Sequence, residues 1–238
     1  MSKEIALLCT LHPSSPEKQE RILSLMRAGA REYYTKPSSL CTTWSYFLPF
    51  LPPKATSITT PVIAGIEIYT DKSALKAQVN DQEFFQAYQK TAEKEGLYSK
   101  EEQLVAWYRT DGFVAREKHA RPFGTCCLVS LTRFVGNRER VLDVLRDFVT
   151  FVRDEEPDVL TYAIFTRPKA EKEVMLFVRY KDMKALRTHS KCPEHDEVVK
   201  KIVKYIENDM STSTTVWQEI EDSFVSTEVG GPSSSAKL

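Results

Sequence analysis

The chain has 238 residues, enough for one large domain or for two of about 120 residues each. Lys and Arg number 33 and Asp and Glu also number 33, so the net charge is zero, which argues against a nucleic-acid partner. Hydrophobic residues make up 42% of the chain, which disfavours global disorder. The 5 cysteines show no CxxC spacing and no regular spacing, which disfavours a disulfide scaffold. No membrane span is expected either, since no apolar run is long enough.

The first half of the chain begins with a predicted helix. Ser15-Pro16 is a typical helix start, and the apolar positions that follow have helical spacing: Ile22, Leu25, Met26, Gly29 and Tyr33. The Pro-rich stretch 49–61 predicts a long loop between two strands. Asp71 is then expected to cap a short helix.

The second half predicts the same elements in the same order. A strand over 126–134 leads to Asn137, which is expected to cap a helix with an apolar face at Val141, Val144, Leu145, Phe148 and Val152. Strands are predicted over 159–166 and 173–180, followed by a short helical turn capped by Asp182. After a break at Pro193, a helix to about Asn208 and a strand over 214–219 complete the pattern.

Short motifs recur in the two halves, which indicates an internal repeat. Tyr69-x-Asp-x-x-Ala-Leu75 matches Tyr180-x-Asp-x-x-Ala-Leu186, and Glu20-Arg-x-Leu23 resembles Glu139-Arg-x-Leu142. The order β-α-β-β-α-β is that of the ferredoxin-like unit. We therefore predict an α+β fold, in which two ferredoxin-like repeats pack their sheets together as an intramolecular, pseudo-dimeric α/β barrel.

The predicted domains follow from this repeat. The first repeat spans 1–118 and includes the insertion at 49–61, a linker covers 119–124, and the second repeat spans 125–225. A chain that contains both halves of the barrel is expected to fold as a monomer, and further dimerisation stays open.

Residues 226–238 are rich in Gly, Pro and Ser, which is typical of a flexible tail. The final residues Ala236, Lys237 and Leu238 differ by one small residue from the Ser-Lys-Leu peroxisomal address. We expect an import receptor as partner and a location in the peroxisomal matrix, with the cytoplasm as the alternative.

Two of the four histidines are the candidate catalytic residues. His189 shares a helical face with Ala185 and Leu186, and His195 precedes the apolar stripe that begins at Val199, so both imidazoles are expected to face the interior. The equivalent residues of the first half are Gln78 and Phe84, so a histidine-dependent pocket belongs to the second half. His189-x-x-Cys192-x-x-His195 could also hold a metal, but no second ligand cluster accompanies it, and we assign no metal.

Aromatic and cationic residues on the predicted strands are the candidate substrate-binding residues. A cavity lined by aromatic rings suits a flat ligand, and a fixed guanidinium stabilises developing negative charge. The rings and the two guanidinium groups are Trp44, Tyr162, Phe177, Trp217, Arg133 and Arg179.

The second half resembles the antibiotic biosynthesis monooxygenase family of the dimeric α/β-barrel superfamily. The residues that carry the resemblance are Glu155-x-Pro-Asp-Val-Leu-x-Tyr162, Phe177-Val-x-Tyr-x-Asp-x-x-Ala-Leu-x-x-His189 and Pro193. Pro157 stands where members usually carry Gly. The resemblance implies an enzyme that oxidises aromatic or polyketide-like molecules with O2 and without a cofactor. His189 or His195 would remove a substrate proton, and the resulting carbanion would react with oxygen.

Two alternatives stay open at this level. Pro193-x-His195 is similar to a segment of the plant polyketide cyclases in the same superfamily, so a non-oxidative cyclase, isomerase or decarboxylase is possible. A ligand-binding or stress-response protein without turnover is the third hypothesis. Oxygen dependence separates the first two hypotheses, and the effect of replacing the histidines separates both from the third.

Overall fold

The structure is a computed structural model that describes residues 4–36, 39–50, 61–116, 127–221 and 223–227. The expected linker at 119–124 and most of the Pro-rich insertion lie outside the described residues, and so do the three residues of the expected peroxisomal address.

Contacts divide the described chain into two compact units. The first unit holds the residues up to Ala106 together with Gln218–Thr227, and the second holds Trp107–Trp217. Residues 107–113 of the first repeat therefore belong to the second unit, and the last residues of the second repeat belong to the first. Because the units group residues by contact and not by repeat, the repeat boundaries 1–118 and 125–225 stay a prediction.

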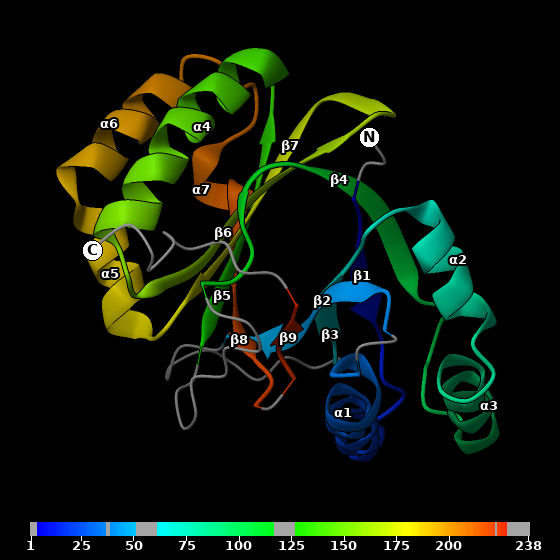
Figure 1. Ribbon diagram of the computed structural model, residues 1–238. Helices are drawn as coiled ribbons and strands as arrows, with labels where there is room; N and C mark the ends of the chain where they lie inside the picture. Colours follow the sequence, from blue (N-terminus) through cyan, green and yellow to red (C-terminus); the bar gives the residue numbers. More distant parts are fainter. Residues whose placement is uncertain (1–3, 37–38, 51–60, 117–126, 222, 228–238) are drawn as a thin grey trace, which may run out of the picture. The chain divides into compact units, whose positions relative to one another are not determined.

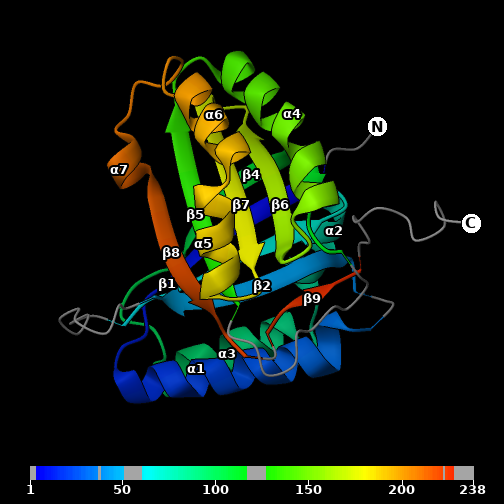
Figure 2. The same cartoon turned by 90° about the vertical axis from the view of Figure 1, so that its left-hand side faces the viewer.

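The first unit is a sheet with helices on one face (Figures 1 and 2). Its strands are β1 (Ile5–Leu11), β2 (Cys41–Pro49), β3 (Ile63–Tyr69), the beginning of β4 (Gln103–Phe113), the end of β8 (Thr214–Glu219) and β9 (Val225–Ser226). Its helices are α1 (Pro16–Gly29), the π-helical turn η1 (Ala30–Tyr34), α2 (Lys72–Asn80) and α3 (Phe85–Glu95). Strand β3 pairs antiparallel with β1 on one side and with β2 on the other.

The second unit repeats this plan (Figure 2). Its strands are β5 (Leu128–Val135), β6 (Val159–Arg167), β7 (Ala170–Tyr180) and the remaining parts of β4 and β8. Its helices are α4 (Arg138–Glu155), α5 (Met183–Lys191), α6 (Pro193–Ile202) and α7 (Met210–Ser213). Strand β7 pairs antiparallel with both β5 and β6, and α4 and α6 pack side by side.

Both repeats arrange their strands in the same order. In the first repeat the order is β4-β1-β3-β2, and in the second it is β8-β5-β7-β6, so the last strand lies beside the first in each case. This arrangement confirms the α+β class and the two ferredoxin-like repeats. Among the described helices, none is both long and apolar enough to span a bilayer.

Side-chain caps begin the helices where the sequence predicts them. The Ser15 hydroxyl accepts a hydrogen bond from the backbone N–H of Lys18, and the Asn137 side chain accepts one from Arg140. Asp71 and Asp182 cap α2 and α5 in the same way. Each cap satisfies an N–H group that has no partner inside its helix, so the start of each helix is determined locally.

The helix after Pro193 is shorter than predicted, and this prediction is wrong. It ends at Ile202 instead of continuing to about Asn208, and Val203, which follows Val199 by one helical turn, is 51% exposed. The reason is tertiary, because Ile206 forms an isolated antiparallel bridge with Gly136. A Cβ at Gly136 would lie 2.2 Å from the Tyr205 carbonyl oxygen, so only glycine allows the two backbones to approach this closely.

Candidate functional site

A cavity of about 230 Å³ lies between the sheet and the helices of the second unit. Apolar side chains from α4, α5, α6, α7 and from β5, β7 and β8 form more than half of its wall. The polar side chains are few, and they include Tyr162, Tyr180, His189 and His195. A mostly apolar cavity with a few convergent polar groups is the usual form of a small-molecule site.

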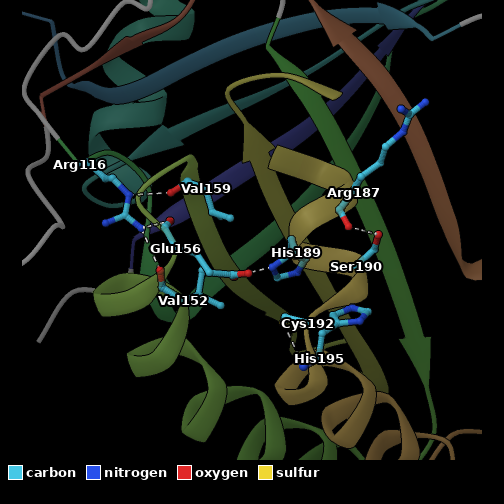
Figure 3. Close-up of polar contacts among 9 residues, drawn as sticks. All are labelled: Arg116, Val152, Glu156, Val159, Arg187, His189, Ser190, Cys192 and His195. Carbon is cyan, nitrogen blue, oxygen red and sulfur yellow. Dashed lines mark hydrogen bonds and ion pairs between the residues drawn. The ribbon is translucent and has the colours of Figure 1, made fainter. Parts of the chain in front are cut away.

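His189 is a buried polar residue of this cavity that has a carboxylate as its partner. It lies near the end of α5, is 4% exposed, and its Nδ1 is 2.6 Å from Oε2 of Glu156 (Figure 3). A carboxylate accepts a hydrogen bond, so this contact places the proton of a neutral imidazole on Nδ1 and leaves Nε2 as the free acceptor. The pair has the form of a general base that is oriented by a carboxylate.

The backbone around Glu156 is held by Arg116. Its guanidinium donates hydrogen bonds to the carbonyl oxygens of Val152, Glu156 and Val159 (Figure 3) and to that of Arg153, at 2.7–2.9 Å. Three of these carbonyls lie in the C-terminal turn of α4 or at its C-cap, and those of Val152 and Glu156 also accept the backbone N–H groups of Glu156 and Val159. Arg116 is therefore a positioning residue, which fixes the end of α4 from which Glu156 reaches His189.

His195 begins α6 beside His189, with 4.9 Å between the two ring centroids. It is half-buried, and its Nδ1 has no hydrogen-bond partner within the described part of the chain. Burial lowers the pKa of His195, and the neighbouring His189 lowers it further, while Asp196 and Glu156 act in the opposite direction. His195 is therefore neutral at neutral pH, so it does not repel a positive charge that forms on His189.

Cys192 has a local structural partner. Its Sγ accepts a hydrogen bond from the backbone N–H of His195 and so caps α6. Within the described ranges, no group of three or more His, Cys, Asp or Glu side chains is arranged to hold a metal ion. The spacing His189-x-x-Cys192-x-x-His195 is thus explained by a helix cap and by two histidines that face the cavity.

The lowered pKa of His195 predicts how stability depends on pH. The unfolded chain takes up a proton at the ordinary pKa of about 6.5, above that of the folded state, so the free energy of unfolding falls as the pH drops below about 6.5. In the His195→Gln variant this contribution is absent. We expect urea unfolding at about pH 7.5 and about pH 5.5 to show a smaller acid-induced loss in the variant than in the wild type. An equal loss would contradict the neutral, buried state of His195.

The sequence-predicted residues separate into two groups. His189, His195 and Tyr162 line the same cavity. Phe177 and Arg179 are buried but do not line it, because they alternate along β7 with Val178 and Tyr180, which do. Nη1 of Arg179 lies 3.5 Å from the Thr161 hydroxyl on β6.

The other predicted substrate-binding residues lie elsewhere. The Arg133 side chain is 58% exposed and pairs with Glu173. The Trp217 indole N–H donates a hydrogen bond to Thr215 and does not line the cavity. Trp44 lines a different cavity, in the first unit. Of the six residues predicted to bind substrate, the structure therefore brings only Tyr162 together with the two histidines.

Glu156 is the residue of the candidate site that sequence reasoning missed. It is the C-cap residue of α4, just before Pro157, where helical periodicity no longer assigns a direction to the side chain. A buried histidine without a partner in its own helix was the available signal, because a buried imidazole requires a hydrogen-bond partner.

One family profile matches the part of the chain that contains most of this cavity's wall. Residues 130–201 match the sequence profile of the antibiotic biosynthesis monooxygenase family, a stretch that includes Glu156, Tyr162, His189 and His195. This stretch of the second repeat is thus similar to an antibiotic biosynthesis monooxygenase (ABM) domain. This ABM-like stretch lies in the second half of the chain, for which the sequence analysis describes the resemblance. It contains His189 and His195, and also Glu156, whose carboxylate contacts His189.

Solved structures share the fold beyond the ABM-like stretch. A candidate monooxygenase of Fusobacterium nucleatum has a TM-score of 0.74 at 12% identity, with 97% of each chain covered. A candidate monooxygenase of Lactobacillus acidophilus has a TM-score of 0.72 at 12% identity, with 95% of this chain and 97% of that chain covered. An anthrone oxidase-like protein has a TM-score of 0.56 at 11% identity, with 100% and 98% covered. No curated protein sequence is significantly similar to the chain. The ABM match supports a monooxygenase-like function in general terms.

Proposed function

We propose that the protein is a cofactor-independent monooxygenase, which oxidises a small aromatic or polyketide-like phenol in the cavity of the second unit. The observation that carries the proposal is the hydrogen bond between His189 and Glu156 at the wall of an apolar cavity. It supplies an imidazole with a defined tautomer beside a cavity whose surface is mostly apolar. These are the requirements for removing a proton from a weakly acidic phenol or anthrone.

The chemistry follows from this base. Nε2 of His189 removes the proton, the imidazolium is stabilised by Glu156, and the substrate becomes a delocalised carbanion. The carbanion transfers an electron to O2, and the two radicals combine at carbon. Overall, a methylene group of the substrate and one O2 molecule become a carbonyl group and one water molecule. One oxygen atom therefore enters the product and the other leaves as water. The substrate supplies all the electrons, and the step requires no separate reductant.

Two further findings support this substrate class. The rings of Tyr162 and Tyr180, which line the cavity, lie 6.1 and 5.5 Å from that of His189, so aromatic surface flanks the base. The ABM match provides the general reaction type, and the anthrone oxidase-like protein shares the fold at low identity. A flat phenolic substrate fits both the apolar wall and the position of the base.

Oxygen dependence is the test of this proposal. The purified protein is incubated with a small-molecule extract of its source, and separately with anthrone, in air and under nitrogen. We expect a product that gains one oxygen atom in air only, detected by mass spectrometry against a protein-free control. With isotopically labelled oxygen gas, the product mass should rise by one labelled oxygen.

The other outcomes would favour the alternatives. A product formed equally under nitrogen would indicate a cyclase, isomerase or decarboxylase that uses the same base. A compound that stays bound and unchanged would indicate a binding protein without turnover. Either result would overturn the monooxygenase proposal.

A further inference from the structure

A second cavity, of about 80 Å³, lies in the first unit. It lies between the sheet and helices α1, α2 and α3, in the position that corresponds to the cavity of the second unit. Gln78 and Phe84, the counterparts of the two histidines, are in its wall. The repeat has therefore kept the place of the cavity and changed its chemistry.

The polar centre of this cavity is the Glu67 carboxylate on β3. Its Oε1 accepts hydrogen bonds from the Tyr46 hydroxyl at 2.6 Å and from the Trp44 indole N–H at 3.3 Å. Its Oε2 accepts one from the Tyr69 hydroxyl at 2.6 Å. A carboxylate offers about four acceptor positions, so about one remains for a ligand. The three donors hold the carboxylate in one orientation.

Close packing places the rings around Glu67. Gly65 pairs with Tyr46 across the sheet, and a Cβ at Gly65 would lie 2.5 Å from the Tyr46 ring. The rings of Tyr34 and Trp44 stack at a centroid distance of 4.7 Å. Phe84 packs against Gly29, where a Cβ would lie 2.4 Å from its ring. These contacts build an aromatic cage, which we define as Tyr34, Trp44, Tyr46, Tyr69, Phe84 and Tyr88.

The charge of the cavity wall has one sign. Glu102 lines the cavity as a second carboxylate, held by the side-chain amide of Gln89 at 3.1 Å. Among the described residues of the wall, none is Lys, Arg or His. The pKa of Glu67 is raised, chiefly by burial and also by the neighbouring Glu102, and the hydrogen bonds from Tyr46, Tyr69 and Trp44 oppose this rise. A bound cation would replace the missing counter-charge and stabilise the ionised carboxylate.

We propose that this cavity is a second ligand site, which binds a small organic monocation such as a protonated arylalkylamine. The ammonium group pairs with Glu67, and the rings of the aromatic cage provide cation–π contacts and cover the apolar part of the ligand. The site is independent of the oxygenase cavity, since its wall consists of residues of the first unit alone.

Calorimetric titration of the full chain tests the proposal with two ligands of the same shape. We expect 2-phenylethylammonium to bind at least about tenfold more tightly than the neutral 2-phenylethanol. In Glu67→Gln, the affinity for the amine should fall at least about tenfold, and that for the alcohol should change less than about twofold. Glu95→Gln is the matched control, because Glu95 is partly exposed and pairs with Arg21 outside the cavity.

The remaining variants keep the test decisive. His195→Gln alters the cavity of the second unit and should leave amine binding unchanged. If circular dichroism shows that Glu67→Gln does not fold, Phe84→Leu removes one ring of the aromatic cage and should weaken amine binding several-fold. Equal affinity for amine and alcohol would overturn the proposal. So would the absence of binding, or amine binding that depends on His195 and not on Glu67 or Phe84.

Discussion

Replacing His189 by glutamine is expected to lower kcat by about 10²–10⁴-fold with little change in KM. The glutamine amide can still donate a hydrogen bond to Glu156, but it cannot accept a proton from the substrate. The measurement is the initial rate of the oxygen-dependent reaction, with substrate concentration varied for both proteins. His12→Gln is the matched control, because His12 lines neither cavity and should keep wild-type kcat.

The role of Glu156 can be separated from that of His189. In Glu156→Gln, the amide N–H would donate to Nδ1 of His189, so the imidazole proton would move to Nε2 and the base would face the cavity in the wrong tautomer. We expect kcat to fall by at least about tenfold, since groups that orient a functional histidine usually contribute that much.

If His189→Gln kept kcat within about twofold of wild type, His189 would not be the base, and His195 would be the next candidate.

Replacing Arg116 by methionine is expected to lower the free energy of unfolding by about 3 kcal/mol. The guanidinium donates to four backbone carbonyls at the end of α4 and the start of β6, and the variant leaves these half-buried acceptors without their charged donor. Methionine retains much of the apolar stem, so the loss reports mainly on the hydrogen bonds. Urea unfolding at neutral pH measures it.

Arg138→Met is the matched control for this variant. Arg138 lies at the other end of α4 and pairs with its neighbour Glu139, at 3.3 Å. Such a surface pair contributes at most about 1 kcal/mol. A loss below about 1 kcal/mol in Arg116→Met would show that these carbonyls are satisfied in another way. Arg116→Met should also lower kcat, because the end of α4 carries Glu156.

The two cavities show how a repeated fold can diverge in chemistry. Tyr69 and Tyr180 occupy matching places at the ends of β3 and β7, and each lines its own cavity. Glu67 in the cavity of the first unit corresponds to Val178 in the cavity of the second unit, and Gln78 corresponds to His189. The cavity of the first unit therefore has its carboxylates on β3 and directly before β4, and the cavity of the second unit has its histidines on helices α5 and α6. This difference favours two ligands of different charge.

Much of the fold could be predicted because its determinants are local. The caps at Ser15, Asp71, Asn137 and Asp182 are in the structure as predicted, and the strand over 214–219 has the predicted bounds. Each cap depends on residues within one helical turn. The internal repeat then extended the assignment from one half to the other. The end of α6 escaped prediction, because it depends on Gly136, which is distant in sequence.

The candidate site was less accessible to sequence reasoning. His189 and His195 were found because helical periodicity gives their direction relative to an apolar face. Phe177 and Arg179 were assigned to the cavity, although Leu176, Val178 and Tyr180 line it. A shift of one residue in a strand reverses the face of every side chain, and sequence alone leaves that parity open.

The sequence by itself determined the α+β class, the two ferredoxin-like repeats, the helix starts and the histidine pair, since all of these follow from short-range patterns. Only the tertiary structure decided which strand face meets the helices, that Glu156 reaches His189 across 33 residues, and that Glu67 lies within an aromatic cage. These contacts join residues that are far apart in the chain. Their geometry depends on strand register and helix packing, which no local pattern records.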